Sequence, residues 1–320
     1  MGLRIGGHCV ALDKHEAESD LNFVSHAHSD HISGIRKNKG TIASEITKAL
    51  VESRGRRFTM AAALPGTRLL SAGHMLGSRQ FYVESELSGY SVVYTGDYLM
   101  QKTYASEEIE IRKADILIMD STYPNPNVVF DERSEVISAI QCYVKQKLNW
   151  GIVLFGAYSM GKAQELIRIF NEIGIAPVVD EKTGNVNRIY DSFGVRLDYE
   201  VAGTGAWPKG NFVGIVNVQK LTQEKLALQG RTCRRVFTAV ATGWAKVVTF
   251  ETDVQFPLSD HADFRQALQY IERCEPKIVY TVGQQAGMLA YNLNRAGQRA
   301  SPFSDRALAE QAIRTILNKA

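Results

Sequence analysis

The stretch VSHAHSDHISG, residues 24–34, holds three of the chain's seven histidines, His26, His28 and His31, together with Asp30. In an extended chain, side chains two positions apart share a side, so His26 and His28 converge on one point while Asp30 and His31 face another. Imidazole and carboxylate groups suit Zn²⁺, or Mn²⁺ where more oxygens are present. Burying three histidines and an acid together is costly unless a cation compensates them. The stretch therefore predicts a metal-binding loop with room for two ions.

Two further ligands follow strand-like runs, His74 in SAGHMLGS and Asp97 in YTGDY. A carboxylate has two oxygens and can bridge two ions, so we expect Asp97 to be shared. The first predicted ion is held by His26, His28, His74 and Asp97. The second is held by Asp30, His31 and Asp97. Because the second ion has fewer ligands, we expect it to bind more weakly. Zn²⁺ is the expected ion, with Mn²⁺ or Mg²⁺ as the alternative at the second position.

Composition narrows the class of protein. With 45% hydrophobic and 22% charged residues in 320, the chain has the make-up of folded proteins and is long enough for two domains. A net charge of +3 predicts no polybasic tail, so any nucleic-acid surface must be local. The four cysteines are scattered and predict neither a zinc knuckle nor a disulfide framework. No leader and no run of about 18 apolar residues is seen, so we expect an intracellular protein, cytoplasmic or nucleoid-associated, without membrane contact.

Runs rich in Val, Ile and Tyr alternate with helical periodicity, which favours a mixed α/β fold. Each strand-like run delivers polar residues at its end, which predicts one rim that collects them; the runs are TRLLSAGH (67–74), QFYVESE (80–86), YSVVYTGD (90–97) and ADILIMD (114–120). A Ser cap and a Gly stop predict a helix over SEITKALVESRG, 44–55. The pattern changes near residue 125 and resumes near 257. We therefore predict one domain from residues 1–125 and 257–320, interrupted by an inserted α/β domain at 126–256.

Several motifs resemble one protein family. SHAHSDH, with His74 and Asp97 following, resembles the metallo-β-lactamase fold, whose members use these positions as metal ligands. MDSTYPNP, with Asp120, and FPLSDHADF, with His261, resemble the acidic and histidine-bearing motifs of the β-CASP nucleases, which carry an inserted α/β domain. The similarity spans essentially the whole chain. It implies an αββα metallo-β-lactamase sandwich with an inserted β-CASP domain.

The strand KIVYTVGQQ bears on the branch of this family. RNA-cleaving members have a third histidine where this chain has Val282, and the Artemis and Apollo type of DNA-processing members resembles it in carrying valine. AGHMLGS, in contrast, is more similar to the RNA branch. The resemblance favours DNA over RNA and implies a metal-dependent nuclease, a 5′ exonuclease or end-processing enzyme of DNA repair. The alternative is an RNA-processing nuclease of the same group. For protein partners the sequence predicts nothing.

The resemblance also implies roles at the reacting bond. Paired ions would stabilise both the attacking and the leaving oxygen at phosphorus, and Asp30 stands among the catalytic residues as well as the ligands. Asp120 is expected to orient a ligand or the water, or to hold its proton. His261 is expected to protonate the leaving 3′ oxygen or to steady the phosphate. The alternative for His261 is a hydrogen-bonded residue at a helix start. The expected product carries a 5′-phosphate.

GAYSMGKA matches a phosphate-binding loop in Gly156, Gly161 and Lys162, but Ala163 replaces the hydroxyl residue that holds Mg²⁺. We therefore expect no ATPase. A turn that opens a helix still suits a phosphate. The residues expected to bind a DNA phosphate are Ser159, Gly161, Lys162 and Ser259. The alternative is a glycine turn that only packs a helix.

Two residues farther along are candidate nucleic-acid contacts. Trp244 in ATGWAK is expected to stack on a base, and Lys246 is expected to meet a phosphate. The alternative is a solvated charged edge beside a packed tryptophan.

Overall fold

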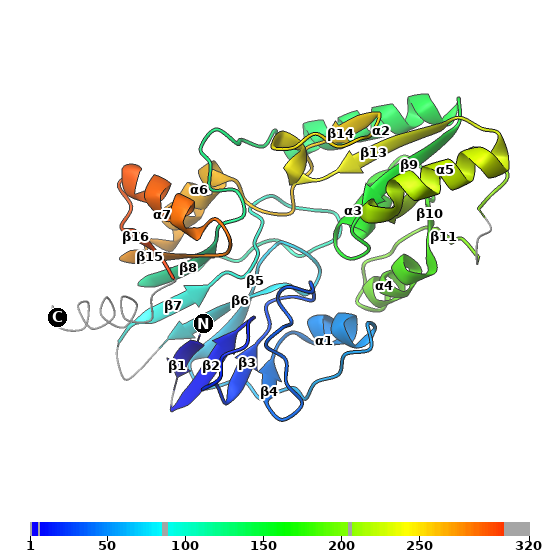
Figure 1. Cartoon of the computed structure of the whole chain (residues 1–320). Coiled ribbons are helices and arrows are strands. Elements are labelled where there is room, and N and C mark those ends of the chain that lie inside the picture. The colour runs from blue at the N-terminus through cyan, green and yellow to red at the C-terminus, as the bar shows by residue number, and fades with distance from the viewer. Residues whose placement is uncertain (1, 6, 85–88, 204–206, 304–320) are drawn as a thin grey trace. The chain divides into compact units, whose positions relative to one another are not determined.

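The computed structural model describes residues 2–5, 7–84, 89–203 and 207–303, which fall into two compact units (Figure 1). Unit 1 consists of Met1–Lys102, Glu107–Val129 and His261–Ala320. Unit 2 consists of Thr103–Ser106 and Phe130–Asp260, against 126–256 for the insertion predicted from the sequence. The identification of unit 2 as a β-CASP domain stays a prediction. None of the helices in the described ranges has the length and apolar character needed to cross a membrane.

Unit 1 contains two sheets (Figure 1). The first has the order β1-β2-β3-β4, from Gly2–Ile5, His8–Leu12, Leu21–Phe23 and Gly40–Ile42. The second has the order β16-β15-β8-β7-β6-β5, from Ala300–Pro302, Ile278–Val282, Ile116–Asp120, Ser91–Tyr94, Arg79–Glu84 and Thr67–Ser71. Pairing is parallel from β16 to β7 and antiparallel from β7 to β5. The strand-like runs of the sequence are thus strands of the second sheet.

The hydrophobic core of unit 1 lies on both faces of the second sheet. Phe23 of the first sheet stacks on Phe81 of the second with ring centroids 4.7 Å apart, in a cluster that joins the two sheets. On the opposite face α6 (Phe264–Cys274) and α7 (Ala286–Arg295), orange in Figure 1, bury residues such as Tyr270 and Leu293 against the strands. A helix layer and two sheets therefore form the unit. The predicted mixed α/β architecture is confirmed.

The predicted helix after the histidine loop is α1 (Glu45–Glu52), and its N-cap Ser44 accepts a hydrogen bond from the amide of Thr47. It ends at Glu52, before Gly55, because Ser53 already provides the C-cap. The hydroxyls of Ser44 and Thr47 both donate to the carbonyl of Gly77, at 2.7 and 3.0 Å. The start of α1 is therefore tied to the turn that carries His74.

Unit 2 is built on one parallel sheet of order β11-β10-β12-β9-β13-β14, from Glu200–Val201, Val178–Val179, Val213–Asn217, Ile152–Ala157, Val236–Ala241 and Val254–Phe256. Its helices are α2 (Arg133–Leu148), α3 (Lys162–Asn171), α4 (Glu181–Ser192) and α5 (Leu221–Thr232), with 3-10 turns η1 (Val218–Lys220) and η2 (Gly243–Lys246). Apolar clusters join α2 and α3 to one face of the sheet and α5 to the other. Because helices cover both faces of this sheet, a buried strand such as β9 is a continuous run of buried, mostly apolar residues.

In unit 1 the polar residues gather just beyond the ends of β3, β5, β7 and β8, as the sequence predicts for the last three strands. The same prediction for QFYVESE is wrong, because β6 is antiparallel to β5 and β7 and its last residue, Glu84, lies opposite Ser91 at the start of β7. Two glycines make the close approach of these ends possible. At Gly96 (φ +55°) a Cβ would stand 2.5 Å from Cβ of Ser25. At Gly73 (φ +77°) it would stand 2.3 Å from the carbonyl oxygen of Leu99. Any side chain at either position would push the loops apart.

Candidate metal centre

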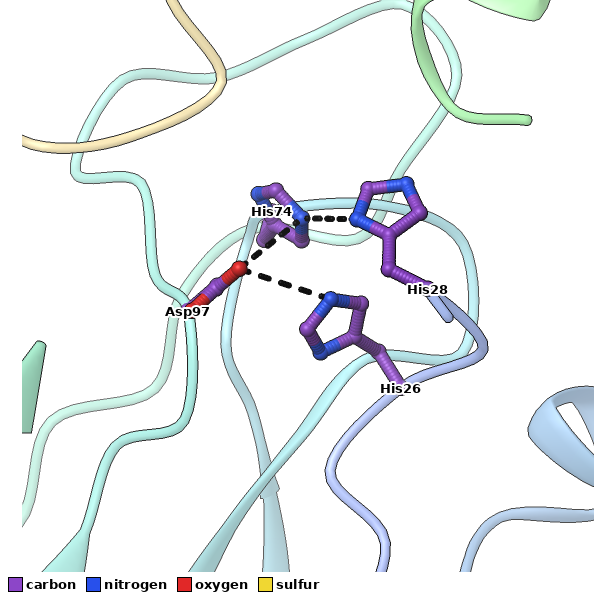
Figure 2. Close-up of side chains that lie close together, drawn as sticks. All are labelled: His26, His28, His74 and Asp97. Atoms are coloured by element: carbon purple, nitrogen blue, oxygen red, sulfur yellow. Dashed lines mark hydrogen bonds and ion pairs between the residues drawn. The ribbon is translucent and has the colours of Figure 1, made fainter. Parts of the chain in front are cut away.

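Four predicted ligands, His26, His28, His74 and Asp97, surround one point in unit 1 (Figure 2). Nε2 of His74 lies 3.1 Å from Nδ1 of His28 and 3.8 Å from Oδ2 of Asp97, and Nε2 of His26 lies 3.5 Å from that oxygen. Ligands about 2.0–2.1 Å from a tetrahedral Zn²⁺ stand roughly 3.3 Å from each other. The spacing and donor types therefore fit a four-coordinate ion.

Buried hydrogen bonds set the tautomer of His26. The hydroxyl of Ser25 donates to Oδ2 of Asp13 at 2.7 Å, so its oxygen is left to accept from Nδ1 of His26, 3.0 Å away. The hydrogen of the His26 ring is thereby on Nδ1, and Nε2 carries the lone pair. This Nε2 is fully buried without a hydrogen-bond partner in the described structure. A buried lone pair of this kind is satisfied by a cation.

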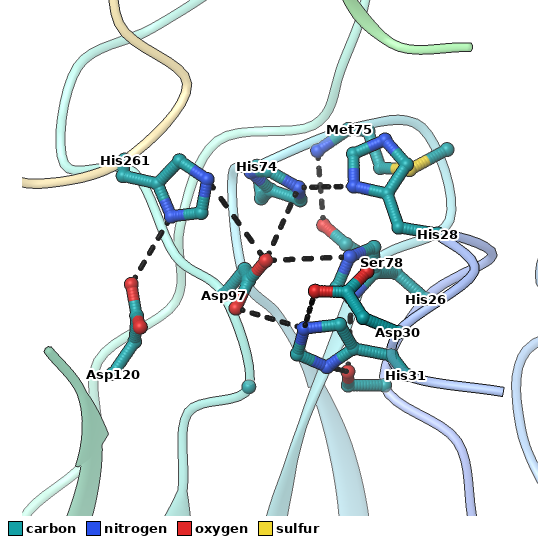
Figure 3. A network of polar contacts seen from close by, with 12 residues as sticks. His26, His28, Asp30, His31, His74, Met75, Ser78, Asp97, Asp120 and His261 are labelled. Atoms are coloured by element: carbon teal, nitrogen blue, oxygen red, sulfur yellow. Dashed lines mark hydrogen bonds and ion pairs between the residues drawn. The ribbon is translucent and has the colours of Figure 1, made fainter. Parts of the chain in front are cut away.

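Asp97 lies between two sets of side chains (Figure 3). Its Oδ1 is 3.2 Å from Nε2 of His31, whereas its Oδ2 faces His26 and His74. His31 in turn is 3.5 Å from the exposed carboxylate of Asp30. The structure thus brings His31 to the second oxygen of Asp97, whereas Asp30 contacts His31 alone among these residues. A second ion held by Asp30, His31 and Asp97 stays a prediction.

A second compact group of ligand atoms consists of Asp97, Asp120 and His261. Nδ1 of His261 is 3.1 Å from Oδ2 of Asp120, and its Nε2 is 3.9 Å from Oδ2 of Asp97 (Figure 3). The hydroxyl of Thr122 donates to the other oxygen of Asp120 at 2.9 Å. With Nδ1 held by a carboxylate, Nε2 of His261 is directed at the shared aspartate. This group was not foreseen as a ligand set.

The register of β15 on β8 places Val282 directly beside Asp120.

Asp13 connects these histidines, and the sequence reasoning missed it. Its buried carboxylate accepts four bonds, each of 2.7 Å: the amide and hydroxyl of Ser25, Nδ1 of His31 and the phenol of Tyr94. Nε2 of His31 is therefore also free to bind a cation. The signal was present, because Asp13 ends the apolar run CVALD as Asp97 and Asp120 end theirs.

The electrostatics of the centre match a cation site. Burial, reinforced by the neighbouring His31, lowers the pKa of His26 well below its usual value. Burial would raise the pKa of Asp97, but the charges of His31, His261 and His26 outweigh it and hold that pKa well below the usual range. Burial likewise opposes charge on His31, yet Asp97 and Asp13 raise the pKa of His31 well above normal. Two buried carboxylates thus attract positive charge to this point, as a proton or as an ion.

The predicted phosphate loop lies in unit 2, between β9 and α3. Gly161 adopts φ +87°, and its amide donates to the side chain of Gln164. The buried Ser159 hydroxyl has no hydrogen-bond partner in the described structure, and the carbonyl of the equally buried Ser259 accepts from Arg133 at 2.7 Å. The hydrogen-bonding capacity of the Ser159 hydroxyl therefore stays available.

Lys162 departs from the expectation. Its buried ammonium donates to Glu165 at 3.0 Å, to the carbonyl of Leu258 at 2.9 Å and to Asp260. All three N–H donors have protein acceptors, so the ammonium has none left for a phosphate. Lys162 instead belongs to a buried ion-pair cluster with Arg133, Glu165 and Asp260.

The two candidate nucleic-acid contacts also lie in unit 2: Trp244 is partly exposed, and Lys246 pairs with Asp131 at 2.8 Å.

No model of a known protein family matches the chain. A probable DNA ligase from Opitutus terrae is 30% identical to it over 95% of the chain, and the 5′ exonuclease Apollo from Gallus gallus is 24% identical over 86%. An RNase J-like protein from Methanocaldococcus jannaschii is 30% identical over 32% of the chain. The chain spans only 30% of the ligase, 62% of Apollo and 25% of the RNase J-like protein.

A crystal structure of a protein of unknown function from Enterococcus faecalis resembles the fold, with a TM-score of 0.57 over 91% of this chain and 82% of that one, at 14% identity. Three independent findings agree: the relatives named above, the ligand groups around Asp97 and the mixed α/β fold. They confirm the resemblance to the metallo-β-lactamase fold and its β-CASP group that the sequence motifs indicate.

Proposed function

We propose that the chain is a metal-dependent DNA nuclease that removes nucleotides from 5′ ends during repair. The observation that carries the nuclease assignment is the group of four ligands, His26, His28, His74 and Asp97. Metal ions bound there would be Zn²⁺ at the four-ligand position, and they would supply acidified water and neutralise charge on the phosphate. The residues that hold them are already oriented by Asp13 and Ser25.

The proposal of DNA as substrate rests on how much of the chain each relative matches. The probable DNA ligase and the 5′ exonuclease Apollo align over 95% and 86% of the chain, whereas the RNase J-like protein aligns over 32%. Valine at position 282, beside Asp120, is a second reason, because the RNA-cleaving branch is expected to have histidine there.

In this proposal His261 transfers a proton. Asp120 holds Nδ1 of the ring, so Nε2 faces the shared aspartate, beside which the reacting phosphate would bind. Hydrolysis adds water oxygen to phosphorus and breaks the bond from phosphorus to the 3′ oxygen. His261 would give that leaving oxygen its proton, and Asp120 would stabilise the ring while its charge changes. A mononucleotide with a 5′-phosphate is the product.

Matched end-labelled strands test the proposal. Single-stranded DNA and RNA of one sequence, each with a 5′-phosphate or a 5′-hydroxyl, are incubated with Zn²⁺, Mn²⁺ or Mg²⁺ and the Asp97→Ala variant as blank. We expect stepwise loss of 5′ nucleotides from DNA and none with the blank. Faster loss from RNA would refute the DNA assignment and leave the nuclease assignment standing.

The second candidate is an RNA-processing nuclease of the same group. The turn AGHMLGS, which carries His74, favours it because this turn is more similar to the RNA branch. The same matched strands separate the two candidates.

A further inference from the structure

Positive charge is concentrated in one segment of unit 1, residues 36–57. It contains seven lysines and arginines against two glutamates, a formal charge of +5, whereas the whole chain carries +3. The segment includes α1 and the loops on either side of it, in light blue in Figure 1. We call its cations the basic patch: Arg36, Lys37, Lys39, Lys48, Arg54, Arg56 and Arg57.

The basic patch rests on the loop that carries the metal ligands. Arg54 donates from Nη1 to the carbonyl of Ala27 at 3.1 Å, and Ala27 stands between His26 and His28. Arg56 donates to the carbonyl of Ile35 at 3.1 Å. Arg36 donates to the same carbonyl at 3.0 Å and to that of Ser33 at 2.8 Å. Three guanidinium groups therefore lie against one loop, and the first of them is bonded between two predicted ligands.

Carboxylates neutralise several other cations of unit 1 but none of these. Arg79 pairs with Glu107, Arg112 with Glu110, Lys113 with Glu275 and Lys277 with Asp115. Over the described ranges, no ion pair involves any member of the basic patch. A guanidinium has five N–H donors; Arg54 and Arg56 each make one hydrogen bond to the loop, and Arg36 makes two. Most of their donors and all of their charge are available to a ligand.

Holding the loop does not account for this charge. A neutral N–H donor could make the same hydrogen bond to a backbone carbonyl, so the loop does not require positive charge. Seven like charges in 22 residues also repel each other. A regular polyanion removes that repulsion, because arginine and lysine bind phosphates and release the condensed counterions.

We propose that the basic patch binds the phosphodiester backbone of the nucleic acid, outside the scissile bond and beside the metal loop. The inference rests on the proposed nuclease function and adds the surface that holds the substrate strand.

Three double variants of the full chain test the proposal. Arg54→Gln with Arg57→Gln removes two charges, and Arg54→Lys with Arg57→Lys keeps both charges while losing the guanidinium fork. Arg273→Gln with Arg299→Gln is the matched control, because both are exposed arginines of unit 1 outside the basic patch. Affinity for a fluorescent phosphorothioate oligothymidylate, which resists cleavage, is measured by anisotropy over a range of salt. Thermal unfolding and metal content report whether each variant is folded.

Loss of two phosphate contacts on a single strand lowers the slope of log affinity against log salt by about 1.4. At about 0.1 M salt this corresponds to roughly 25-fold weaker binding, which disappears near 1 M. We expect this for the Gln variant, with the Lys variant and the control close to the wild type.

An unchanged slope in the Gln variant, or equal loss in the control, overturns the proposal. Loss in the Lys variant equal to that in the Gln variant also overturns it, because loop geometry and not charge would then be responsible. If the Gln variant loses binding to phosphatidylserine vesicles but not to DNA, the patch belongs to a membrane surface. Wild-type binding through the patch without cleavage by any ion would reject the nuclease function and leave the patch intact. Cleavage by the wild type, with an unchanged salt slope in the Gln variant, would reject the patch and leave the nuclease function intact.

Discussion

Replacing Asp13 by alanine tests how the metal centre is oriented. The carboxylate accepts four bonds of 2.7 Å, and two of them fix which nitrogen of His26 and of His31 carries the lone pair. In Asp13→Ala the hydroxyl of Ser25 is free to donate to Nδ1 of His26. The hydrogen of that ring then moves to Nε2, where it blocks an ion. His31 loses its acceptor in the same way.

The magnitude follows from these bonds. Substituting a residue that orients a metal ligand typically costs about 10–100-fold in metal affinity. Each buried donor left unpaired costs about 1–3 kcal/mol, but the hydroxyls of Ser25 and Tyr94 can turn to other partners. We therefore expect the free energy of unfolding to fall by about 2–5 kcal/mol in total.

Calorimetric titration of the chelated protein with Zn²⁺, together with thermal unfolding, measures both effects. Asp20→Ala is the matched control, because Asp20 also accepts from a backbone amide, at 2.6 Å, and from a histidine Nδ1, at 2.8 Å, but on the exposed surface. The control should bind Zn²⁺ like the wild type. If Asp13→Ala loses stability but keeps wild-type metal affinity, Asp13 does not set the tautomers and the reasoning is refuted.

Three further predictions concern single positions. His261→Ala should lower the cleavage rate about 10²–10⁴-fold, as measured in single-turnover assays, while His26-centred metal binding persists; a rate within threefold (about 0.6 kcal/mol) would contradict its role. Gly96→Ala should lower the unfolding free energy by about 1–3 kcal/mol, because its Cβ would meet Ser25 at φ +55°; a denaturation midpoint like the wild type would argue against it. Burial would raise the pKa of Glu107, but the hydrogen bond and charge of Arg79 and a backbone amide outweigh burial, so the pKa is lowered. The ion pair of Glu107 therefore stabilises the folded state fully above pH 4.5, the ordinary glutamate value. This stabilisation is lost as the pH falls through the lower pKa of the folded state. The stability gap between wild type and Glu107→Gln should therefore close in acid, and a gap independent of pH would be inconsistent with the ion pair.

The sequence predicted the parts of this protein that repeat a simple physical rule. Strands that end in polar residues gave the rim with His74, Asp97 and Asp120, because parallel strand ends meet at one edge of a sheet. The capped helix after the histidine loop followed from Ser44. Spacing alone could not supply Asp13, which lies far from His31 in the sequence and becomes its partner only when β2 and β3 pair.

Charge and burial were harder to predict. The phosphate role assigned to Lys162 assumed an exposed side chain, but the folded chain surrounds its ammonium with Glu165, Asp260 and a carbonyl. The basic patch was overlooked for the opposite reason. A net charge of +3 suggested no concentration of positive charge, although seven lysines and arginines lie within residues 36–57 and none of them has a carboxylate partner in the described structure.

The central claim is that the ligands around Asp97 hold ions that drive cleavage of DNA. It is tested most directly by chelating the protein, adding Zn²⁺ or Mn²⁺ back in steps, and measuring release of 5′ mononucleotides from labelled single-stranded DNA beside Asp97→Ala. We predict that release is absent after chelation, rises with bound metal to a plateau and stays absent in the variant. Release by the chelated protein, or by Asp97→Ala at the wild-type rate, would contradict the account.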